Sequence, residues 1–163
     1  MTDTSQPILL LAEDDAALRD LLVLALSQAG WRVICASDGL AALELARRWK
    51  PHMLLLDILL PKFNGLDVLQ ALKKQAGFEQ LPIIIMSELA FRETVQQAIR
   101  AGAQAFIVKP FVAQDVVDKV QRARQEPVRQ AAASQAKPER APEVRPYQPP
   151  ALRKAIPNQP TTG

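Results

Sequence analysis

Four apolar runs in this chain each end in polar residues of a type that can do chemistry. The first run ends in two acids, the second in one acid, the third in a hydroxyl, and the fourth in an amine directly before a proline. Short apolar runs are typical of buried strands, and ligands bind at the carboxyl ends of strands in an open parallel sheet. We therefore expect the four runs to direct their polar ends into one cleft. The residues are Glu13 and Asp14 after residues 8–12, Asp57 after residues 53–56, Ser87 after residues 83–86, and Lys109 after residues 106–108.

The three carboxylates of this set, Glu13, Asp14 and Asp57, indicate a metal site. Carboxylates that converge without a cation repel one another and raise each other's pKa values. A hard divalent ion removes this repulsion, and Mg²⁺ accepts a few carboxylates together with waters and a phosphate oxygen. The alternative is an acidic first helical turn favoured by the helix dipole, which explains one acid better than a pair. The neighbouring Asp15 is expected to cap the helix that follows.

The motifs resemble the receiver domain of two-component response regulators, and in particular its stand-alone type, the chemotaxis response regulator. The resemblance covers roughly residues 7–125, about three quarters of the chain. Each short motif alone is a weak signal, but five in the right order, each at a strand end, form a specific pattern. The motifs are Glu13–Asp14, Asp57 with Asn64–Gly65, Ser87, Gly102–Ala103, and Phe106 with Lys109–Pro110–Phe111.

The resemblance implies that Asp57 is a phosphoacceptor, the nucleophile that forms an acyl phosphate. It implies that the backbone carbonyl of Leu59 joins the three carboxylates around the metal ion. Lys109 would pair with the phosphoryl group and with the Asp57 carboxylate as a point charge, and the Lys109–Pro110 bond would be cis. The alternatives are an acid that only caps the following loop and a lysine that is solvated at a strand end.

The resemblance also implies a switch formed by Ser87 and Phe106. The Ser87 hydroxyl would bond a phosphoryl oxygen only after phosphorylation, and its movement would make room for Phe106 to turn inward. This would change the surface formed by residues 91–124. The alternative is that Ser87 caps the helix expected at 91–101 and Phe106 is a fixed part of the core.

A signalling switch is the function that this resemblance predicts, in preference to a metabolic enzyme. The chain would accept a phosphoryl group from a partner histidine kinase or histidine-phosphotransfer protein and would signal by protein–protein contact. Self-phosphorylation and slow self-dephosphorylation would be its only intrinsic chemistry. The alternative is a receiver-like interaction module that works without phosphorylation. Glu88 is the main support for that alternative, because the family usually has a small residue there.

Two classes of enzyme with a related fold are excluded by the residues at two places in the sequence. Flavodoxin-like and nucleotide-binding enzymes need a phosphate cradle rich in glycine or hydroxyl residues after the first strand. Residues 13–15 are all acidic and would repel a phosphate. A haloacid-dehalogenase-type phosphatase would need a second aspartate two residues past the nucleophile, where this chain has Leu59.

The polar ends require a framework of alternating strands and helices. Strands that are apolar almost throughout are buried on both faces, which indicates a parallel sheet covered by helices. The alternation predicts a doubly wound α/β fold, and the resemblance adds a five-stranded, flavodoxin-like sheet in the order 2-1-3-4-5. We expect strands at 8–12, 32–36, 53–57, 82–86 and 104–108, and helices at about 15–29, 38–49, 65–75, 91–101 and 112–124.

Some side chains have predicted positions in this framework. The first helix should direct Leu18, Leu21, Leu22, Ala25 and Leu26 inward from one face. The second helix is expected to begin at a cap formed by Ser37 or Asp38, and the third at Asn64. Trp31 and Trp49 should pack at the lower rim of the domain. The one cysteine, Cys35, lies in the apolar run 31–36 and is expected to be a buried, inert thiol.

Charge and composition divide the chain into a flexible start at 1–6, a receiver domain at 7–125 and a tail at 126–163. Residues 1–125 hold 14 basic and 14 acidic residues, whereas residues 126–163 hold 6 and 3, so the net charge of +3 belongs to the tail. The balanced domain gives no electrostatic reason to expect direct nucleic-acid binding. The tail is rich in proline, lacks apolar periodicity and is expected to be disordered.

No segment has the length and apolar content of a membrane span, which needs roughly 18 consecutive apolar residues. Residues 1–7 lack the basic region and the apolar stretch of a signal peptide. We therefore expect a cytoplasmic protein without a membrane span.

Overall fold

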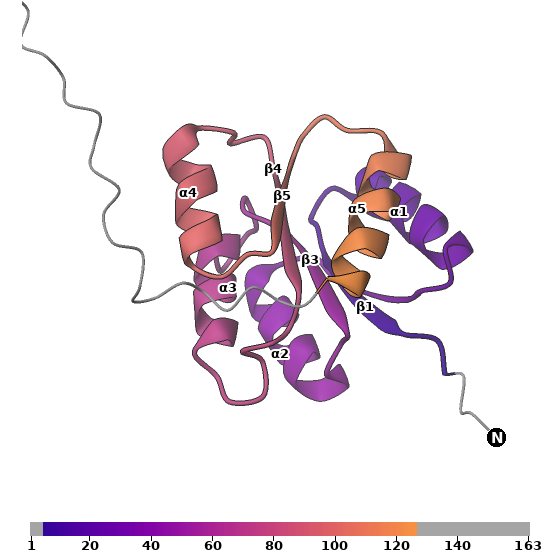
Figure 1. The fold of residues 1–163 in the computed structure, drawn as a ribbon, viewed down its shortest axis with the longest axis horizontal. Coiled ribbons are helices and arrows are strands. Elements are labelled where there is room, and N and C mark those ends of the chain that lie inside the picture. Colours follow the sequence, from indigo (N-terminus) through magenta and orange to yellow (C-terminus); the bar gives the residue numbers. More distant parts are fainter. Residues whose placement is uncertain (1–4, 127–163) are drawn as a thin grey trace, which may run out of the picture.

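The structure, a computed structural model, describes residues 5–126 and alternates five strands with five helices, as the sequence predicts (Figure 1). Every element lies within two residues of its predicted bounds. Most of the proposed start at 1–6 and tail at 126–163 lies outside the described residues. No helix among residues 5–126 is long and apolar enough to cross a membrane. The elements are β1 (Ile8–Ala12), α1 (Ala16–Gln28), β2 (Arg32–Ala36), α2 (Gly39–Trp49), β3 (Met53–Asp57), α3 (Gly65–Lys73), β4 (Ile83–Ser87), α4 (Arg92–Arg100), β5 (Ala105–Val108) and α5 (Ala113–Gln125).

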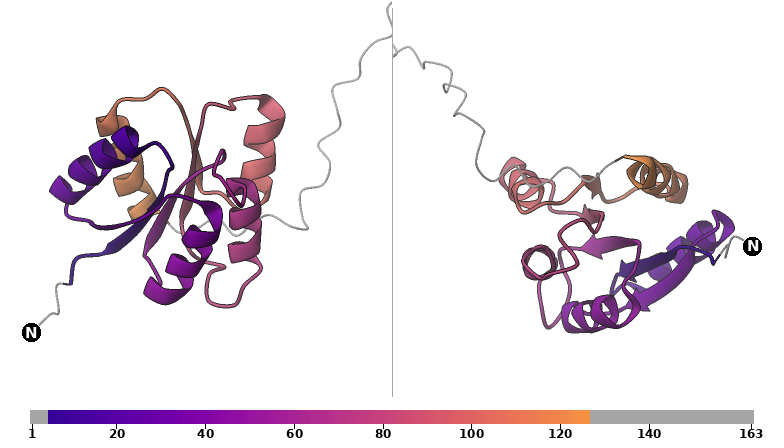
Figure 2. Two further views of the ribbon diagram at one scale, coloured as in Figure 1. Left: turned by 180° about the vertical axis from the view of Figure 1, so that it is seen from behind. Right: turned by 60° about the horizontal axis from the view of Figure 1, so that its bottom comes forward.

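The five strands form one parallel sheet in the order β2-β1-β3-β4-β5. Helices α1 and α5 cover one face, and α2, α3 and α4 cover the other (Figures 1 and 2). The predicted doubly wound α/β fold and its strand order are therefore confirmed. Because all strands run in the same direction, their carboxyl ends, and the polar residues that follow them, meet at one edge of the sheet.

The core is built on the three central strands. Every residue of β3 and β4 is buried, and so is β1 from Leu9 onward. The edge strands are different, because each has a hydrogen-bonded neighbour on one side only. Cys35 in the edge strand β2 is exposed, so the prediction of a buried thiol is wrong.

Helix α1 buries a narrower stripe than its sequence suggests. Leu22 and Leu26 are fully buried against β1, but the side chain of Leu21 is 49% exposed, and its predicted inward position is wrong. Neighbouring residues of a helix point about 100° apart. The stripe centred on Leu22 and Leu26 therefore leaves Leu21 on its outer border.

Side-chain caps start three of the helices that leave the carboxyl edge of the sheet, namely α1, α2 and α3. Asp15 Oδ1 accepts a hydrogen bond from the Leu18 N–H at 3.0 Å, and Asn64 Oδ1 accepts one from Leu66 at 2.7 Å. The cap of α2 is Asp38 and not Ser37, since Asp38 Oδ1 accepts from the Ala41 N–H at 2.8 Å. This hydrogen bond, with the nearby Lys62 ammonium, holds the pKa of Asp38 below its ordinary value.

Gly65 allows the start of α3 to pass directly over the end of β3. A Cβ atom at this position would overlap the carbonyl oxygen of Asp57. The close approach is held by a hydrogen bond from the Gly65 N–H to the carbonyl of Ile58 at 2.9 Å. The chain that follows Asp57 is thus pinned against the strand that carries it.

Candidate functional site

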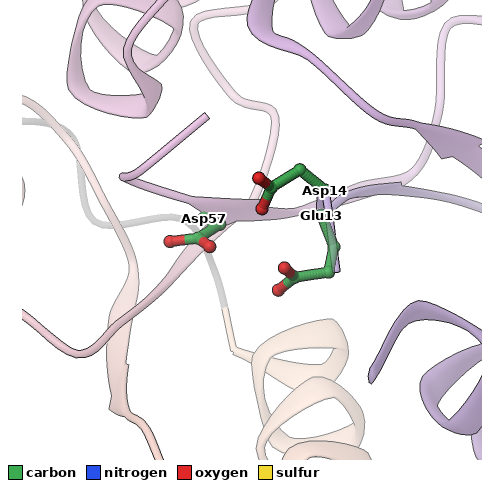
Figure 3. Close-up of side chains that lie close together, drawn as sticks. All are labelled: Glu13, Asp14 and Asp57. Atoms are coloured by element: carbon green, nitrogen blue, oxygen red, sulfur yellow. The ribbon is translucent and has the colours of Figure 1, made fainter. Parts of the chain in front are cut away.

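The carboxyl edge of the sheet has a cleft of about 430 Å³ that collects most of the predicted site residues. Figure 3 shows its three acids, which approach one another from the ends of β1 and β3. Ser87 and Phe106 are the two predicted site residues that do not line it. The lining residues are Glu13, Asp14, Asp15, Leu18, Asp57, Leu59, Glu88 and Lys109.

Asp57 is the last residue of β3, and its position is fixed by both of its carboxylate oxygens. Oδ1 accepts a hydrogen bond from the Leu59 N–H at 3.1 Å, and Oδ2 accepts one from Lys109 Nζ at 2.7 Å. The residue is 4% exposed and lies at the carboxyl end of a strand that is otherwise apolar. A buried carboxylate of this kind is tolerated because charged and dipolar donors replace the water that it has lost.

Glu13, directly after β1, is fully buried. Its Oε2 accepts a hydrogen bond from Lys109 Nζ at 2.7 Å, and its Oε1 accepts one from the Asp15 N–H at 3.1 Å. Burial raises the pKa of the Glu13 carboxyl above its ordinary value, and the bonds from Lys109 and Asp15 offset part of that rise. The Glu13–Lys109 ion pair was not predicted, because the sequence alone does not show which of the nearby carboxylates the lysine contacts.

Lys109 therefore bridges two carboxylates that arrive from different strands. Burial acts to lower the pKa of its ammonium group, but the hydrogen bonds to Asp57 and Glu13 outweigh it and raise the pKa. The lysine is held in place by its backbone, since its N–H donates to the Ser87 carbonyl at 2.9 Å. The Lys109–Pro110 peptide bond is cis, as the resemblance implies.

Asp14 completes a set of oxygen ligands that suits a divalent cation. One carboxylate oxygen from each of Glu13, Asp14 and Asp57 lies within 4.8 Å of the others. Three carboxylates face one ammonium, so two negative charges remain without a partner inside the cleft when all four groups are ionised. Oxygen ligands with excess negative charge fit Mg²⁺. The carbonyl of Leu59 stays a predicted ligand.

Ser87 and Phe106 lie next to the cleft. Ser87 is fully buried at the end of β4, and its Oγ accepts a hydrogen bond from the Leu89 N–H at 3.0 Å. It does not cap α4, whose first turn has no side-chain cap. Phe106 is half-buried in β5 and lines a separate groove between β5 and α5. Their roles as a switch stay predictions.

Two further residues shape the entrance of the cleft. Glu88, next to Ser87, is exposed and lines the cleft, and it does not cap α4. Leu59, two residues past Asp57, also lines the cleft and is 49% exposed. The entrance thus combines one apolar side chain with one additional negative charge.

Comparison with known proteins supports the assignment made from this geometry. The profile of the response regulator receiver domain matches residues 9–121. The DNA-binding response regulator MtrA of Mycobacterium tuberculosis is 34% identical over 122 residues, which are 75% of this chain and 52% of that protein. The DNA-binding dual master transcriptional regulator RpaA of Synechocystis is 31% identical over 114 residues, 70% of this chain and 47% of that protein. The chain thus matches about half the length of these curated relatives.

Solved structures give the same result. A putative response regulator from Chloroflexus aurantiacus superposes with a TM-score of 0.71 at 27% identity, over 75% of this chain and all of that one. The chemotaxis response regulator CheY4 of Vibrio cholerae superposes with a TM-score of 0.69 at 25% identity, over 73% of this chain and 99% of that one. On its fold, its acidic cleft and these matches, the chain belongs to the family of two-component response regulator receiver domains.

Proposed function

We propose that this receiver takes a phosphoryl group onto Asp57 from the phosphohistidine of a partner histidine kinase or histidine-phosphotransfer protein in the cytoplasm. The observation that carries the proposal is the setting of Asp57. Its carboxylate lies at the floor of an open cleft, 2.7 Å from the Lys109 ammonium and beside two acids able to hold a cation. A nucleophile, a fixed positive charge and a cation site are the parts that phosphoryl transfer to a carboxylate needs.

In the transfer step, an oxygen of Asp57 forms a bond to phosphorus while the bond from phosphorus to the donor nitrogen breaks. The electron pair of the broken bond stays on the histidine of the donor. The product is an acyl phosphate that brings about −1.5 to −2 charges into the cleft. Lys109 already contacts the Asp57 carboxylate and can follow the charge as it moves onto the phosphoryl oxygens.

Glu13, Asp14 and Asp57 would hold Mg²⁺, with the Leu59 carbonyl as the fourth protein ligand. The bound ion would neutralise charge on the phosphoryl oxygens. The chain itself must keep these ligands in position before the ion arrives. Lys109 does this for Glu13 and Asp57, and the Leu59 N–H does it for the second oxygen of Asp57.

Signalling is proposed to follow from Ser87. Its hydroxyl oxygen accepts a bond from the Leu89 N–H, and its own proton can still be donated to a phosphoryl oxygen. A shift of Ser87 toward the phosphoryl group would break the bond to Leu89 and move the loop before α4. Phe106, half-buried on the adjacent strand, would then turn inward.

The proposed role is that of a switch and not of an enzyme with turnover on other substrates. The one histidine of the chain, His52, directly precedes β3, at the opposite end of that strand from Asp57, and its Nδ1 accepts a hydrogen bond from the Ile8 N–H. No histidine is therefore available in the cleft as a general base. A receiver-like module that works without phosphorylation is the second candidate, favoured by the exposed acid Glu88 at the entrance.

The test is the intact mass of the full chain after incubation with a small acyl-phosphate donor. We expect one added phosphoryl group when Mg²⁺ is present and none when it is chelated. Asp57→Asn should keep the fold and lose the adduct. Equal labelling of the Asp57→Asn variant and the parent would contradict the assignment, and a parent that stays unlabelled would favour the second candidate.

A further inference from the structure

The loop between β3 and α3, residues 58–64, carries two groups that the proposed chemistry uses. The Leu59 N–H donates to Asp57 Oδ1 at 3.1 Å, and the Leu59 carbonyl is the predicted fourth protein ligand of the cation. A ligand on a flexible loop binds a cation weakly, because binding must first order the loop. The contacts that hold this loop in one conformation therefore bear on the chemistry at Asp57.

The first half of the loop is held by the sheet and by the helix that follows. The Ile58 N–H donates to the Met86 carbonyl at 3.3 Å, and the Ile58 carbonyl accepts bonds from the N–H groups of Leu60 and Gly65 at 3.0 and 2.9 Å. The side chains of Ile58 and Leu60 are buried in the core. Residues 61–63, in the second half, contact a different element, the start of α2.

The start of α2 meets the second half of the loop at three points. The Gly39 N–H donates to the Pro61 carbonyl at 3.2 Å, and Lys62 Nζ lies 3.1 Å from Asp38 Oδ2. The third contact is steric, because a Cβ atom at Gly39 would overlap the carbonyl oxygen of Phe63. Gly39 does not have a positive φ, so the close approach, and not the backbone conformation, requires glycine here.

Lys62 is held in a backbone conformation that lysine rarely adopts. Its φ is +65°, and the Phe63 N–H donates to the Pro61 carbonyl at 2.8 Å, so residues 61–63 form a γ-turn with Lys62 at its centre. A γ-turn with a positive φ at its central residue is rare and strained, and glycine or asparagine adopts this conformation more easily. Such strain persists only where surrounding contacts hold it. A lysine at this position supplies one of those contacts, since its side chain reaches Asp38.

The ion pair between Lys62 and Asp38 adds little to the stability of the fold. The side chain of Lys62 is 64% exposed, and ion pairs at the surface contribute little to the free energy of unfolding. Asp38 caps α2 without help from Lys62, because its Oδ1 accepts from the Ala41 N–H while its Oδ2 faces the lysine. The pair therefore bears more on where the loop lies than on whether the domain folds.

We propose that these contacts form a latch between the start of α2 and the loop, and that Gly39, Asp38 and Lys62 are positioning residues for the cation at Asp57. The latch keeps the loop in place, so that Leu59 is positioned before the cation arrives. Groups that orient a metal ligand without contacting the metal have large effects on metal affinity. This inference rests on the proposed function, because it concerns the cation that phosphoryl transfer to Asp57 would use.

The experiment measures binding of Mn²⁺, a spectroscopic substitute for Mg²⁺, to the full chain in the absence of a phosphoryl donor. The electron paramagnetic resonance signal of the free ion reports the fraction bound. Gly39→Ala should weaken binding by about tenfold, because the loop must move to accommodate the Cβ atom. Lys62→Met should weaken it by about threefold, since only an exposed ion pair is lost. Lys62→Arg can keep the pair with Asp38 and should bind Mn²⁺ as the parent does.

The variant Asp38→Asn isolates the ion pair, because asparagine caps a helix about as well as aspartate does. It should also weaken Mn²⁺ binding by about threefold. The double variant Asp38→Asn/Lys62→Met should be no weaker than either single variant, because both substitutions remove the same pair. Thermal unfolding shows whether each variant is folded, and these variants carry the test if Gly39→Ala does not fold.

The rate of phosphorylation by a small acyl-phosphate donor separates positioning from damage to the fold. Gly39→Ala and Lys62→Met should need more Mg²⁺ for the half-maximal rate, by the same factors as for Mn²⁺ binding. At saturating Mg²⁺ their rates should come within about twofold of the parent rate, because the bound ion then orders the loop. A variant with a damaged fold would instead lose labelled protein at every Mg²⁺ concentration.

Two variants at the other end of the sheet are matched controls. Lys50→Met replaces another lysine with a positive φ, of +44°, which ends α2. Gly77→Ala places alanine at a φ of +90°, so it should lower stability without touching the loop. Both should bind Mn²⁺ within about twofold of the parent, because distant sites act independently.

The proposal would be overturned by unchanged affinity in both Gly39→Ala and Lys62→Met, or by an equal loss of affinity in the two controls. Fully additive losses in the double variant, or a parent that binds no Mn²⁺ at millimolar concentration, would also overturn it. A parent that binds Mn²⁺ but takes no phosphoryl group would contradict the proposed function, and the order of the Mn²⁺ affinities would still decide for or against the latch.

Discussion

The charged side chains at the two ends of this sheet differ in burial and in the partners that they contact. At the carboxyl end, Glu13, Asp57 and Lys109 are buried or nearly so, and each has a partner of opposite charge at 2.7 Å. At the amino end, Arg32, Arg48 and Arg124 are exposed and lie over tryptophan rings in place of acids. Burial makes pairing obligatory, because an unpaired buried charge is very costly. The comparison teaches that burial and ion pairing fix the charged side chains of the carboxyl end, whereas the arginines of the amino end stay in contact with solvent.

Removing the Lys109 ammonium group, which bridges Glu13 and Asp57, should have the largest effect on the chemistry at the carboxyl end of the sheet. In Lys109→Met, Glu13 and Asp57 keep their burial but lose their common partner. Phosphorylation by a small donor at saturating Mg²⁺ should slow by about 10²-fold or more, since one preorganised charge at the developing phosphoryl charge is lost. Arg32→Met, at the amino end, serves as the control and should leave the rate unchanged. Rates for Lys109→Met close to those of the parent would show that the bridge has no role in transfer.

A pair of glycines tests whether the carboxyl end is also the more tightly packed. Gly65→Ala places a Cβ atom against the backbone of Asp57 and should cost about 2–3 kcal/mol in free energy of unfolding. Gly77→Ala, in the loop at the other end, meets no atom within 4 Å, but its φ of +90° disfavours alanine, and it should cost about 1 kcal/mol. Chemical denaturation measures both. The reverse order of the two costs is incompatible with the close approach at Gly65.

The exposed acid at the cleft entrance should have a smaller effect. Glu88→Ala removes a negative charge from the route of an incoming phosphoryl donor and should speed phosphorylation several-fold, consistent with about 1 kcal/mol off the barrier. Glu44→Ala, an exposed acid in the middle of α2, is the matched control. An unchanged rate in stopped-flow measurements would mean that the Glu88 side chain stays clear of the donor.

Substitution of Leu59 should have the smallest effect. It should change the lifetime of the phosphorylated form and leave the rate of phosphorylation unaffected. Its half-exposed apolar side chain stands beside Asp57 and can shield the acyl phosphate from water. Leu59→Asn should therefore shorten the lifetime of the phosphorylated form by a few-fold, with at most about 1 kcal/mol off the hydrolysis barrier. The decay is followed after removal of the donor, with Leu40→Asn, an exposed leucine at the start of α2, as the control. A longer or equal lifetime in Leu59→Asn would rule out shielding.

The sequence predicted the parts of the fold that depend on local pattern. The runs that became β1, β3 and β4 are apolar almost from end to end, and the caps Asp15 and Asn64 stand where a strand gives way to a helix. Because all strands of such a sheet end at the same edge, the meeting of Glu13, Asp14, Asp57 and Lys109 also followed from local information.

What the sequence did not predict depends on neighbours that are distant along the chain. The exposure of Cys35 follows from the place of β2 at the sheet edge, and the order 2-1-3-4-5 could have indicated it. The exposed Leu21 reflects how narrow a stripe of α1 meets β1. The bridge from Lys109 to Glu13 joins the ends of β1 and β5, which are not adjacent in the sheet, and Arg124 of α5 lies over the ring of Trp31, which precedes β2. Side-chain pairs of this kind require the packed structure.

The most direct test of the proposed function identifies the residue that carries the phosphoryl group. The full chain is phosphorylated with a small donor and Mg²⁺, treated with borohydride, which reduces an acyl phosphate to an alcohol, and digested for peptide mass mapping. We predict a single reduced residue at Asp57, absent when Mg²⁺ is chelated. Reduction at Glu13 or Asp14 instead, or no reduced residue while the intact protein carries a phosphoryl group, would contradict the assignment of Asp57 as the phosphoacceptor.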